Sequence, residues 1–294
     1  MISTTRLCVF VAFSLCLVAA TAPRALAQDP APAEPAASSP APAPAPVQND
    51  DDDDAVLDPA EPDFTIVNLP TTMPLPVHKS NFRLTHRFAG NLRNGTFAQN
   101  ASNLFGLDQG ATIGFEYRFA PVRHVQLAAY RSSFDKTIQL YGKYDAIRQR
   151  GSMPVSISAL VSVEGTNNFQ EHYAPAIGVV VSRLVAGRVA AYATPIWVHN
   201  TAAALDRDEN TFLLGLGGRA RIHHTTYVVA EVTPRLSGYA PDQVEYGFGL
   251  EQRVGGHTFV LTFTNTFAST FGQLARGGPA DALYLGFNLG RKFF

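Results

Sequence analysis

The sequence contains little cysteine, little charge and no long apolar run beyond its N-terminus. Its two cysteines, Cys8 and Cys16, exclude a disulfide framework in the body of the chain. Charged residues make up 16% of the 294 residues, well below the roughly 25% of a typical soluble domain. No run of about 18 apolar residues follows the N-terminus, which excludes helical membrane spans. The chain nevertheless holds 20 Phe and 10 Tyr residues, which indicates apolar surface facing something other than water.

Residues 1–27 have the pattern of a cleaved secretory signal peptide. A basic Arg6 precedes an apolar stretch at residues 7–20, and a small-x-small cleavage site follows at residues 25–27. Neither cysteine follows a small residue, so a lipoprotein anchor is not indicated. A proline and an arginine follow an apolar core that is short for a span, which argues against an uncleaved anchor helix. We therefore expect secretion.

Residues 28–63 are predicted to form a disordered, acidic linker. The first 19 of them contain seven prolines and seven alanines without apolar periodicity, so they cannot bury enough surface to offset their ordering entropy. Much of this stretch is expected to be an extended, semi-rigid tether. Five consecutive aspartates follow at residues 50–54; a solvated run is the favoured interpretation and a calcium site the alternative.

The charge is distributed unevenly between this N-terminal part and the rest of the chain. Residues 1–63 carry 10 of the 24 acidic and 2 of the 23 basic side chains, so 14 acidic and 21 basic ones remain in residues 64–294. The body therefore has a net charge of +7 behind an acidic tail. We place the one domain boundary at this change in composition, near Phe64.

The body alternates between apolar and polar residues with the period of β-strands. At residues 111–119, for example, Phe115 and Tyr117 alternate with Glu116 and Arg118. About twelve such segments are predicted: residues 82–88, 111–119, 125–131, 138–144, 155–163, 177–183, 189–198, 212–222, 227–233, 246–251, 259–265 and 283–289. Short turn signals containing Gly, Pro or Asn separate them, which favours antiparallel up-and-down connections. No segment shows a helical period of any length.

Alternation alone fits both a soluble sandwich and a membrane barrel. In a sandwich the polar face would meet water and carry more charge than this chain has. In a bilayer no sheet edge can stay open, so the strands must close on themselves. We therefore predict a closed transmembrane β-barrel of about twelve strands at residues 64–294, with aromatic residues near the strand ends facing the lipid interfaces. The predicted lumen-facing charges are Glu116, Arg118, Lys143, Glu164, Arg219, Arg221, Glu231 and Glu251.

The chain ends in two phenylalanines after an amphipathic segment. A C-terminal aromatic resembles the signal that the bacterial barrel-insertion machinery reads, so Phe294 is predicted to engage that machinery. In the usual pattern the terminal aromatic shares its face with the apolar residues, but here Leu289 has the parity of Phe293. Either a bulge shifts the register or Phe293 is the effective terminal residue.

The sequence also resembles a domain-of-unknown-function family of bacterial outer-membrane β-barrel proteins. The resemblance covers nearly all of residues 78–294 and excludes the linker. It rests on residues 81–88 (NFRLTHRF), 103–108 (NLFGLD), 131–137 (RSSFDKT), 153–156 (MPVS), 217–219 (GGR), 256–259 (GHTF), 263–265 (FTN) and 286–289 (GFNL). The family carries no assigned activity, so the resemblance implies a fold and an outer-membrane location without a mechanism.

Catalysis, cofactors, metals and nucleic acid are not indicated. None of the histidines in the body accompanies a nucleophile elbow or a zinc-type spacing. The three carboxylates at residues 206–209 could suggest a calcium loop, but Arg207 lies among them and the glycine and ligand ladder of an EF-hand is missing. The basic side chains alternate along strands and form no clustered strip for nucleic acid. We predict no enzymatic activity.

Two functional classes remain open, with a third less favoured. The first is a passive outer-membrane pore whose basic lumen favours anionic solutes, motivated by the net charge of the body. The second is a closed structural barrel, filled by paired Glu and Arg, whose N-terminal tether reaches a periplasmic or cell-wall partner. The third is a soluble periplasmic barrel that binds an apolar ligand. Strand number does not decide between the first two, because side chains and inserted loops can close a barrel of this size.

Overall fold

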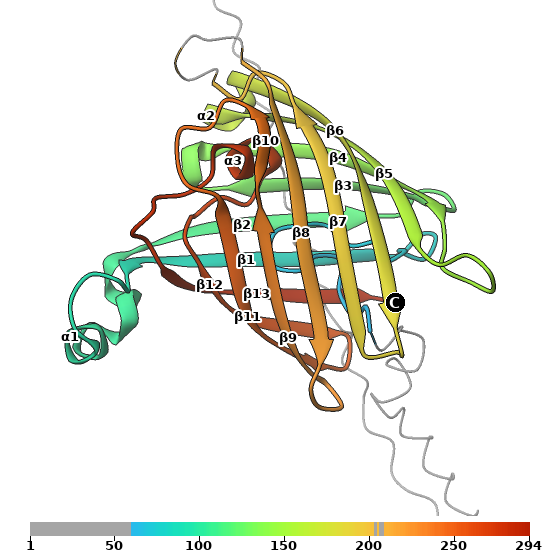
Figure 1. Cartoon of the computed structure of the whole chain (residues 1–294), viewed down its shortest axis with the longest axis horizontal. Helices are drawn as coiled ribbons and strands as arrows, with labels where there is room; N and C mark the ends of the chain where they lie inside the picture. Colours follow the sequence, from blue (N-terminus) through green and yellow to red (C-terminus); the bar gives the residue numbers. More distant parts are fainter. Residues whose placement is uncertain (1–59, 203–204, 206–208) are drawn as a thin grey trace, which may run out of the picture. The chain divides into compact units, whose positions relative to one another are not determined.

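The computed structural model describes residues 60–202, 205 and 209–294. The predicted signal peptide, most of the predicted linker with its aspartate run, and most of the acidic loop around Arg207 lie outside the described residues. Figure 1 shows a single closed barrel of tilted antiparallel strands. Within the described part of the chain, no helix is long and apolar enough to cross a bilayer.

Twelve strands close the barrel, and each pairs with its neighbours in an antiparallel ladder. Their bounds are β1 Ser80–Asn91, β2 Ala111–Phe119, β3 Val125–Ser132, β4 Ile138–Ile147, β5 Ser156–Gly165, β6 Glu171–Val185, β7 Val189–Val198, β8 Thr211–Arg221, β9 Thr226–Thr233, β11 Glu245–Val254, β12 His257–Thr264 and β13 Tyr284–Phe293. The short β10 (Arg235–Gly238) continues β9 after Pro234 and pairs with the same neighbour, β8. Proline lacks the N–H that a ladder needs, which explains the interruption.

The predicted fold class and strand number are confirmed, and all twelve predicted segments coincide with strands. The strands extend beyond the predicted bounds mainly at their ends, as in β6, where alternation was evident only over residues 177–183. Among the described residues, five short helical segments were not predicted: α1 (Phe97–Ser102), η2 (Leu104–Gln109), η3 (Phe134–Lys136), α2 (Thr166–Phe169) and α3 (Phe271–Arg276). None exceeds six residues, which is too short to show a helical period.

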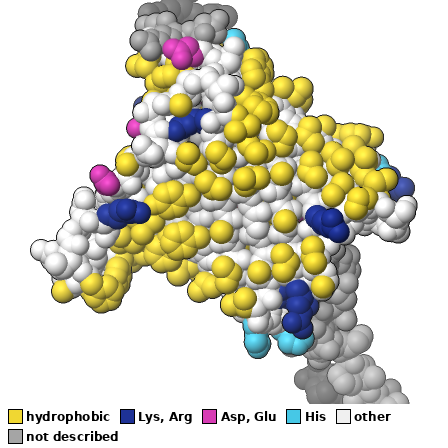
Figure 2. Space-filling view, in the orientation of Figure 1, with side chains coloured by type: hydrophobic (Ala, Val, Ile, Leu, Met, Phe, Trp, Pro, Cys, Tyr) yellow, Lys and Arg dark blue, Asp and Glu magenta, His cyan; other side chains and the backbone are white. Residues whose placement is uncertain are grey.

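The barrel wall is apolar outside and polar inside. In β2, Phe115 and Tyr117 are about half exposed, whereas Glu116 and Arg118 are buried. Figure 2 shows hydrophobic side chains spread over the outer wall with few charges among them. Trp197, the single tryptophan of the chain, lies on this outer face near the end of β7 and stacks on His199. This is the inverse of a soluble protein and is the arrangement that a lipid bilayer requires.

The two ends of the barrel differ in the length of their connections. One end carries turns of two to eight residues, such as residues 255–256 and 148–155, together with the end of β13 and the start of β1. The opposite end carries two 19-residue loops, at residues 92–110 and 265–283. We call these the short-turn end and the long-loop end.

The last strand is paired with β1 in regular register from Gly286 to Phe293, and the register shift between the two strands lies before Gly286. The ladder between β12 and β13 is continuous from Tyr284 to Arg291, and Phe293 pairs with Ser80 of β1. Phe293 therefore lies on the outer face with Leu289. Phe294 instead packs against a buried cluster of Phe64, Met73, Leu75 and Ala120.

Candidate functional site

The N-terminal described segment forms a hairpin inside the barrel. Residues 60–73 and Leu75 are all buried. A tight turn closes the tip, where the Ile66 N–H donates to the Leu69 carbonyl at 2.9 Å, and Thr71 N–H donates to the Phe64 carbonyl at 2.9 Å. We call residues 60–75 the lumenal hairpin. Its contacts reach strands on every side of the barrel, as described below, so it occupies the lumen.

A single wall carboxylate holds the tip of the lumenal hairpin. Glu231 of β9 accepts hydrogen bonds from three consecutive backbone N–H groups, those of Val67, Asn68 and Leu69, at 3.0, 2.8 and 3.0 Å. Consecutive N–H groups in a turn form a concave anion-binding nest, and here the anion is a side chain of the barrel. Hydrogen bonds to a charged acceptor in a low-dielectric interior are stronger than neutral ones.

Basic and amide side chains of the wall hold the hairpin carbonyls. Lys143 of β4 donates to the carbonyls of Thr71 and Met73, both at 2.8 Å. On the opposite side, Arg219 of β8 donates to the Thr65 carbonyl and Asn288 of β13 to the Val67 carbonyl, each at 2.8 Å. Near the short-turn end Arg148 donates to the Thr72 carbonyl at 2.6 Å. The wall thus satisfies main-chain groups that would otherwise be buried without partners.

Side chains of the hairpin add specific contacts. Asn68 accepts a hydrogen bond from Arg87 at 3.2 Å and donates to Glu245 at 3.3 Å. The hydroxyls of Thr72 and Ser182, the latter on β6, lie 2.5 Å apart. Within the hairpin, the Glu61 carboxylate accepts from the N–H of Thr72 at 3.0 Å. Burial raises the pKa of Glu61, although the nearby Lys143 and Arg148 counteract it.

Helix α3 fills the lumen from the long-loop end. All of its residues except Arg276 are buried. Thr270 and Gln273 form a capping box at its start, and the N–H of Gly272 donates to the Glu164 carboxylate of β5 at 2.8 Å. Glu164 therefore binds α3 as Glu231 binds the hairpin, but it accepts a hydrogen bond from one backbone N–H instead of three.

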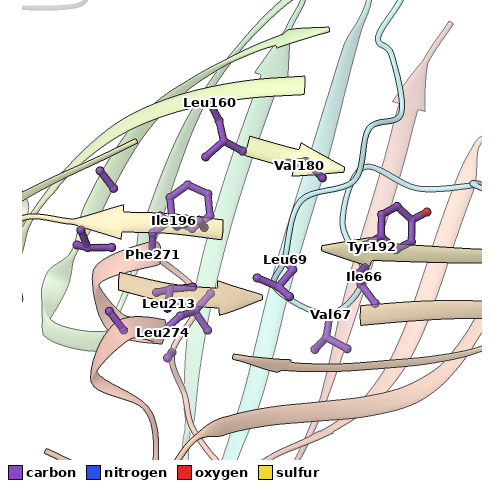
Figure 3. Packing of buried hydrophobic residues seen from close by; sticks show 14 of the residues in the cluster. Ile66, Val67, Leu69, Leu160, Val180, Tyr192, Ile196, Leu213, Phe271 and Leu274 are labelled. Atoms are coloured by element: carbon purple, nitrogen blue, oxygen red, sulfur yellow. The ribbon is translucent and has the colours of Figure 1, made fainter. Parts of the chain in front are cut away.

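The two inserted elements share one apolar cluster in the middle of the barrel (Figure 3). Ile66, Val67 and Leu69 come from the hairpin tip, and Phe271 and Leu274 come from α3. Wall residues complete the cluster, among them Leu160, Val180, Ile196 and Leu213. The polar lumen therefore contains a buried apolar cluster where the two elements meet.

Ion pairs line the wall around the hairpin. Glu116 lies 3.2 Å from Arg83 and 2.8 Å from Arg118, and Arg219 lies 2.7 Å from Glu251. Among the described residues, the fully buried charged side chains of the barrel comprise seven basic and six acidic ones, and the hairpin adds two acidic ones. The excess positive charge of the body is therefore not concentrated among these buried side chains.

The structure buries seven of the eight residues predicted to face the lumen. They are Glu116, Arg118, Lys143, Glu164, Arg219, Glu231 and Glu251. Arg221 is half-buried at the short-turn end. Sequence reasoning missed Arg83, Arg87, Asp145, Glu245, Arg253 and Lys292, which are buried as well. Their alternation with apolar neighbours, as in β1, was a signal that could have found the first two.

Histidine side chains make polar contacts on the exposed surface of the barrel. His199 contacts Asn210 and His257 contacts Arg291, both on the exposed surface. Over residues 60–202, 205 and 209–294, no group of three His, Cys, Asp or Glu side chains is placed to hold a metal ion.

Comparisons with known proteins give a family and a set of fold neighbours. No curated protein is significantly similar in sequence to this chain. Among solved structures, the KdgM porin aligns with 73% of this chain and 99% of its own at 8% identity and a TM-score of 0.47. An outer membrane channel from Pseudomonas putida F1 aligns with 74% of this chain and 97% of its own at 10% identity and a TM-score of 0.47.

The family comparison covers most of the chain. The profile of the family described as "membrane bound beta barrel domain", DUF5777, matches residues 63–293, which include the lumenal hairpin from Asp63 onward as well as the strands of the barrel. The chain therefore belongs to this family of membrane-bound β-barrels.

Proposed function

We propose that the protein is an outer-membrane channel that its own lumenal hairpin holds closed. The observation that carries this proposal is the set of hydrogen bonds between the hairpin main chain and strands β1, β4, β8, β9 and β13. A membrane barrel with a polar inner wall is the framework of a channel, and an ordered segment across the lumen closes it.

The hairpin is connected to the barrel in a way that would let it withdraw from the lumen. The tip, at residues 66–69, contacts Arg87 and Glu231, while Leu75 packs near Ala120, in the β2–β3 turn at the short-turn end. The chain then continues from the hairpin directly into β1 at that same end. Withdrawal through the short-turn end therefore requires no threading of the chain through the barrel. Water can replace the hydrogen bonds of the hairpin with the wall, whereas its apolar contacts with the wall must be broken.

The proposed location sets the orientation. Outer-membrane barrels place short turns on the periplasmic side, so the hairpin would enter from the periplasm and the preceding residues would reach a periplasmic partner. For insertion, Phe293 is the terminal aromatic on the lipid-facing side and Phe294 faces inward. We propose that the insertion machinery reads this pair, with Phe293 as the lipid-facing member.

A permanently closed, structural barrel is the second candidate. The observation that favours it is the apolar cluster joining the hairpin tip to α3, because separating these side chains exposes apolar surface to water. The near balance of buried charges supports neither anion nor cation preference. The two candidates differ in whether the hairpin ever withdraws from the lumen.

A disulfide lock separates the two candidates. The Thr72 and Ser182 hydroxyl oxygens lie 2.5 Å apart, so a T72C/S182C pair places two sulfur atoms where a disulfide can form. We expect the reduced variant and the wild type to conduct in planar bilayers and the oxidised variant to be silent. The single variants T72C and S182C control for the substitutions and should not respond to oxidation. If neither the wild type nor the reduced variant conducts, the channel proposal is overturned and the structural barrel is favoured.

A further inference from the structure

The β1–β2 loop, residues 92–110, carries an exposed apolar surface that the proposed channel does not use. It contains α1 and η2 and projects from the rim at the long-loop end (Figure 1). Phe97 is 78% exposed, Leu104 55% and Leu107 43%. The Phe97 ring also lies 5.7 Å from that of Phe105. We call the exposed side chains of Phe97, Leu104 and Leu107 the apolar patch.

The loop is held rigidly at its base. Gly90 of β1 and Gly106 of η2 are in such close contact that a Cβ on Gly90 would lie 2.3 Å from the Cα of Gly106. Gly106 also has a φ of +90°, which favours glycine. A capping box between Thr96 and Gln99 orders the start of α1. These contacts fix the base of the loop against β1 and order the start of α1.

The central part of the loop, where the exposed apolar side chains lie, carries no charge. Residues 94–107 contain no charged side chain. The β7–β8 loop at the same end holds four charged residues at positions 206–209. A neutral segment of Asn, Gln, Ser and Thr with Phe and Leu suits the boundary between headgroups and acyl chains, where apolar side chains enter and polar ones stay at the surface.

The apolar patch is continuous with the lipid-facing wall. In Figure 2 hydrophobic side chains cover the edge of the projecting loop and continue onto the adjoining barrel wall. The loop packs against β1 and β13, whose outward residues include Phe88 and Phe287. A surface continuous with the lipid belt has lipid as its neighbour unless it turns away from the membrane.

We propose that the β1–β2 loop is a membrane foot that inserts Phe97, Leu104 and Leu107 into the outer leaflet beside the barrel. The partner is therefore the lipid surface itself. The foot would hold the long-loop rim at a defined depth through burial of these three side chains.

Leu104 and Leu205 offer a matched pair for a test, since both are 55% exposed at the long-loop end and only Leu205 lies in the charged loop. We would attach an environment-sensitive fluorophore to L104C and to L205C in a C8S/C16S background, reconstitute the full-length chain in phosphatidylcholine vesicles, and add lipid with a nitroxide on its acyl chain. We expect about twofold or stronger quenching at position 104, as for an apolar face buried at the acyl boundary, and little at position 205.

Measurements on the same labelled proteins could also overturn the proposal that the β1–β2 loop inserts into the membrane. Equal, weak quenching at both positions would place the patch in water. Efficient cysteine cross-linking between two copies through F97C, with position 104 shielded from the lipid quencher, would assign the patch to an interface between copies instead. A heat-modifiable band on a gel, checked for each variant, shows that the barrel itself has folded.

Discussion

The lumenal hairpin and helix α3 both fill the lumen, but the barrel holds them in different ways. The hairpin main chain is held by charged side chains on four strands and by the amide of Asn288 on a fifth. Helix α3 caps itself and is held mainly by packing of Phe271, Leu274 and Ala275 in the apolar cluster. Hydrogen bonds exchange readily with water, whereas apolar packing does not. We therefore expect the hairpin to be the movable closure and α3 the permanent one.

The largest expected effect is on the hairpin, in E231A. This change leaves the N–H groups of Val67, Asn68 and Leu69 without their acceptor, at about 1–3 kcal/mol for each buried unpaired group. We expect a marked increase in open-channel time in planar bilayers and faster protease cleavage within residues 60–75. Unchanged conductance together with unchanged protease resistance would contradict the assignment of Glu231 as the main anchor.

The next effect is on α3, in L274A. Leu274 is fully buried in the cluster, so truncation creates a cavity and should lower stability by about 2–5 kcal/mol. We expect the heat-modified band to appear at a lower temperature, while channel activity stays close to that of the wild type because both ends of the loop remain attached to strands. Strong conductance in L274A would show that α3, and not the hairpin, is the gate.

A smaller effect is expected for E164Q, the counterpart of E231A on α3. Glu164 accepts one N–H, that of Gly272, and the glutamine oxygen can still accept it. The loss should be about 1 kcal/mol, detectable as a small shift in the heat-modification temperature. E231Q, measured in the same way, should show a larger shift, because the Glu231 carboxylate accepts three N–H groups and Glu164 only one. Equal shifts in the two variants would mean that the additional N–H groups do not strengthen the binding.

The smallest effect is a pH dependence that arises from Glu61. Its pKa is raised by burial, so ionisation opposes the docked hairpin, and docking should strengthen as pH falls through this raised value and level off below the ordinary value. As the pH is lowered toward the ordinary glutamate pKa of 4.5, the wild type should therefore close further. E61Q should respond less over this interval. A wild-type pH response that E61Q retains in full would have to come from other groups.

The sequence predicted the wall of the barrel far better than its contents. Alternation along a strand shows which side each residue occupies, because one face of the strand meets lipid and the other meets the lumen. An example is the run Phe115, Glu116, Tyr117 and Arg118. The hairpin has no period, and its Ile66, Val67 and Leu69 are satisfied only by α3 and by distant strands. Long-range contacts of this kind leave no local pattern.

Local signals for α3 and for the C-terminus were present but weak. Thr270 and Gln273 match a capping box, yet a six-residue helix is too short for a hydrophobic period to confirm it. The alternation toward the C-terminus left a bulge or a terminal Phe293 as the alternatives, and the continuous ladder of β13 supports Phe293. What parity could not show is that Phe294 packs beside Phe64 and Met73 of the hairpin.

The position of Trp197 gives the molecule a built-in optical reporter. As the single tryptophan, on the outer face near the long-loop end, it contributes all of the indole fluorescence of the chain. When the strands enter a bilayer, the indole passes from water to the interfacial zone where tryptophan side chains accumulate, and its emission should shift to the blue. Insertion can therefore be timed on the unlabelled protein, and brominated lipids can report the depth of this rim.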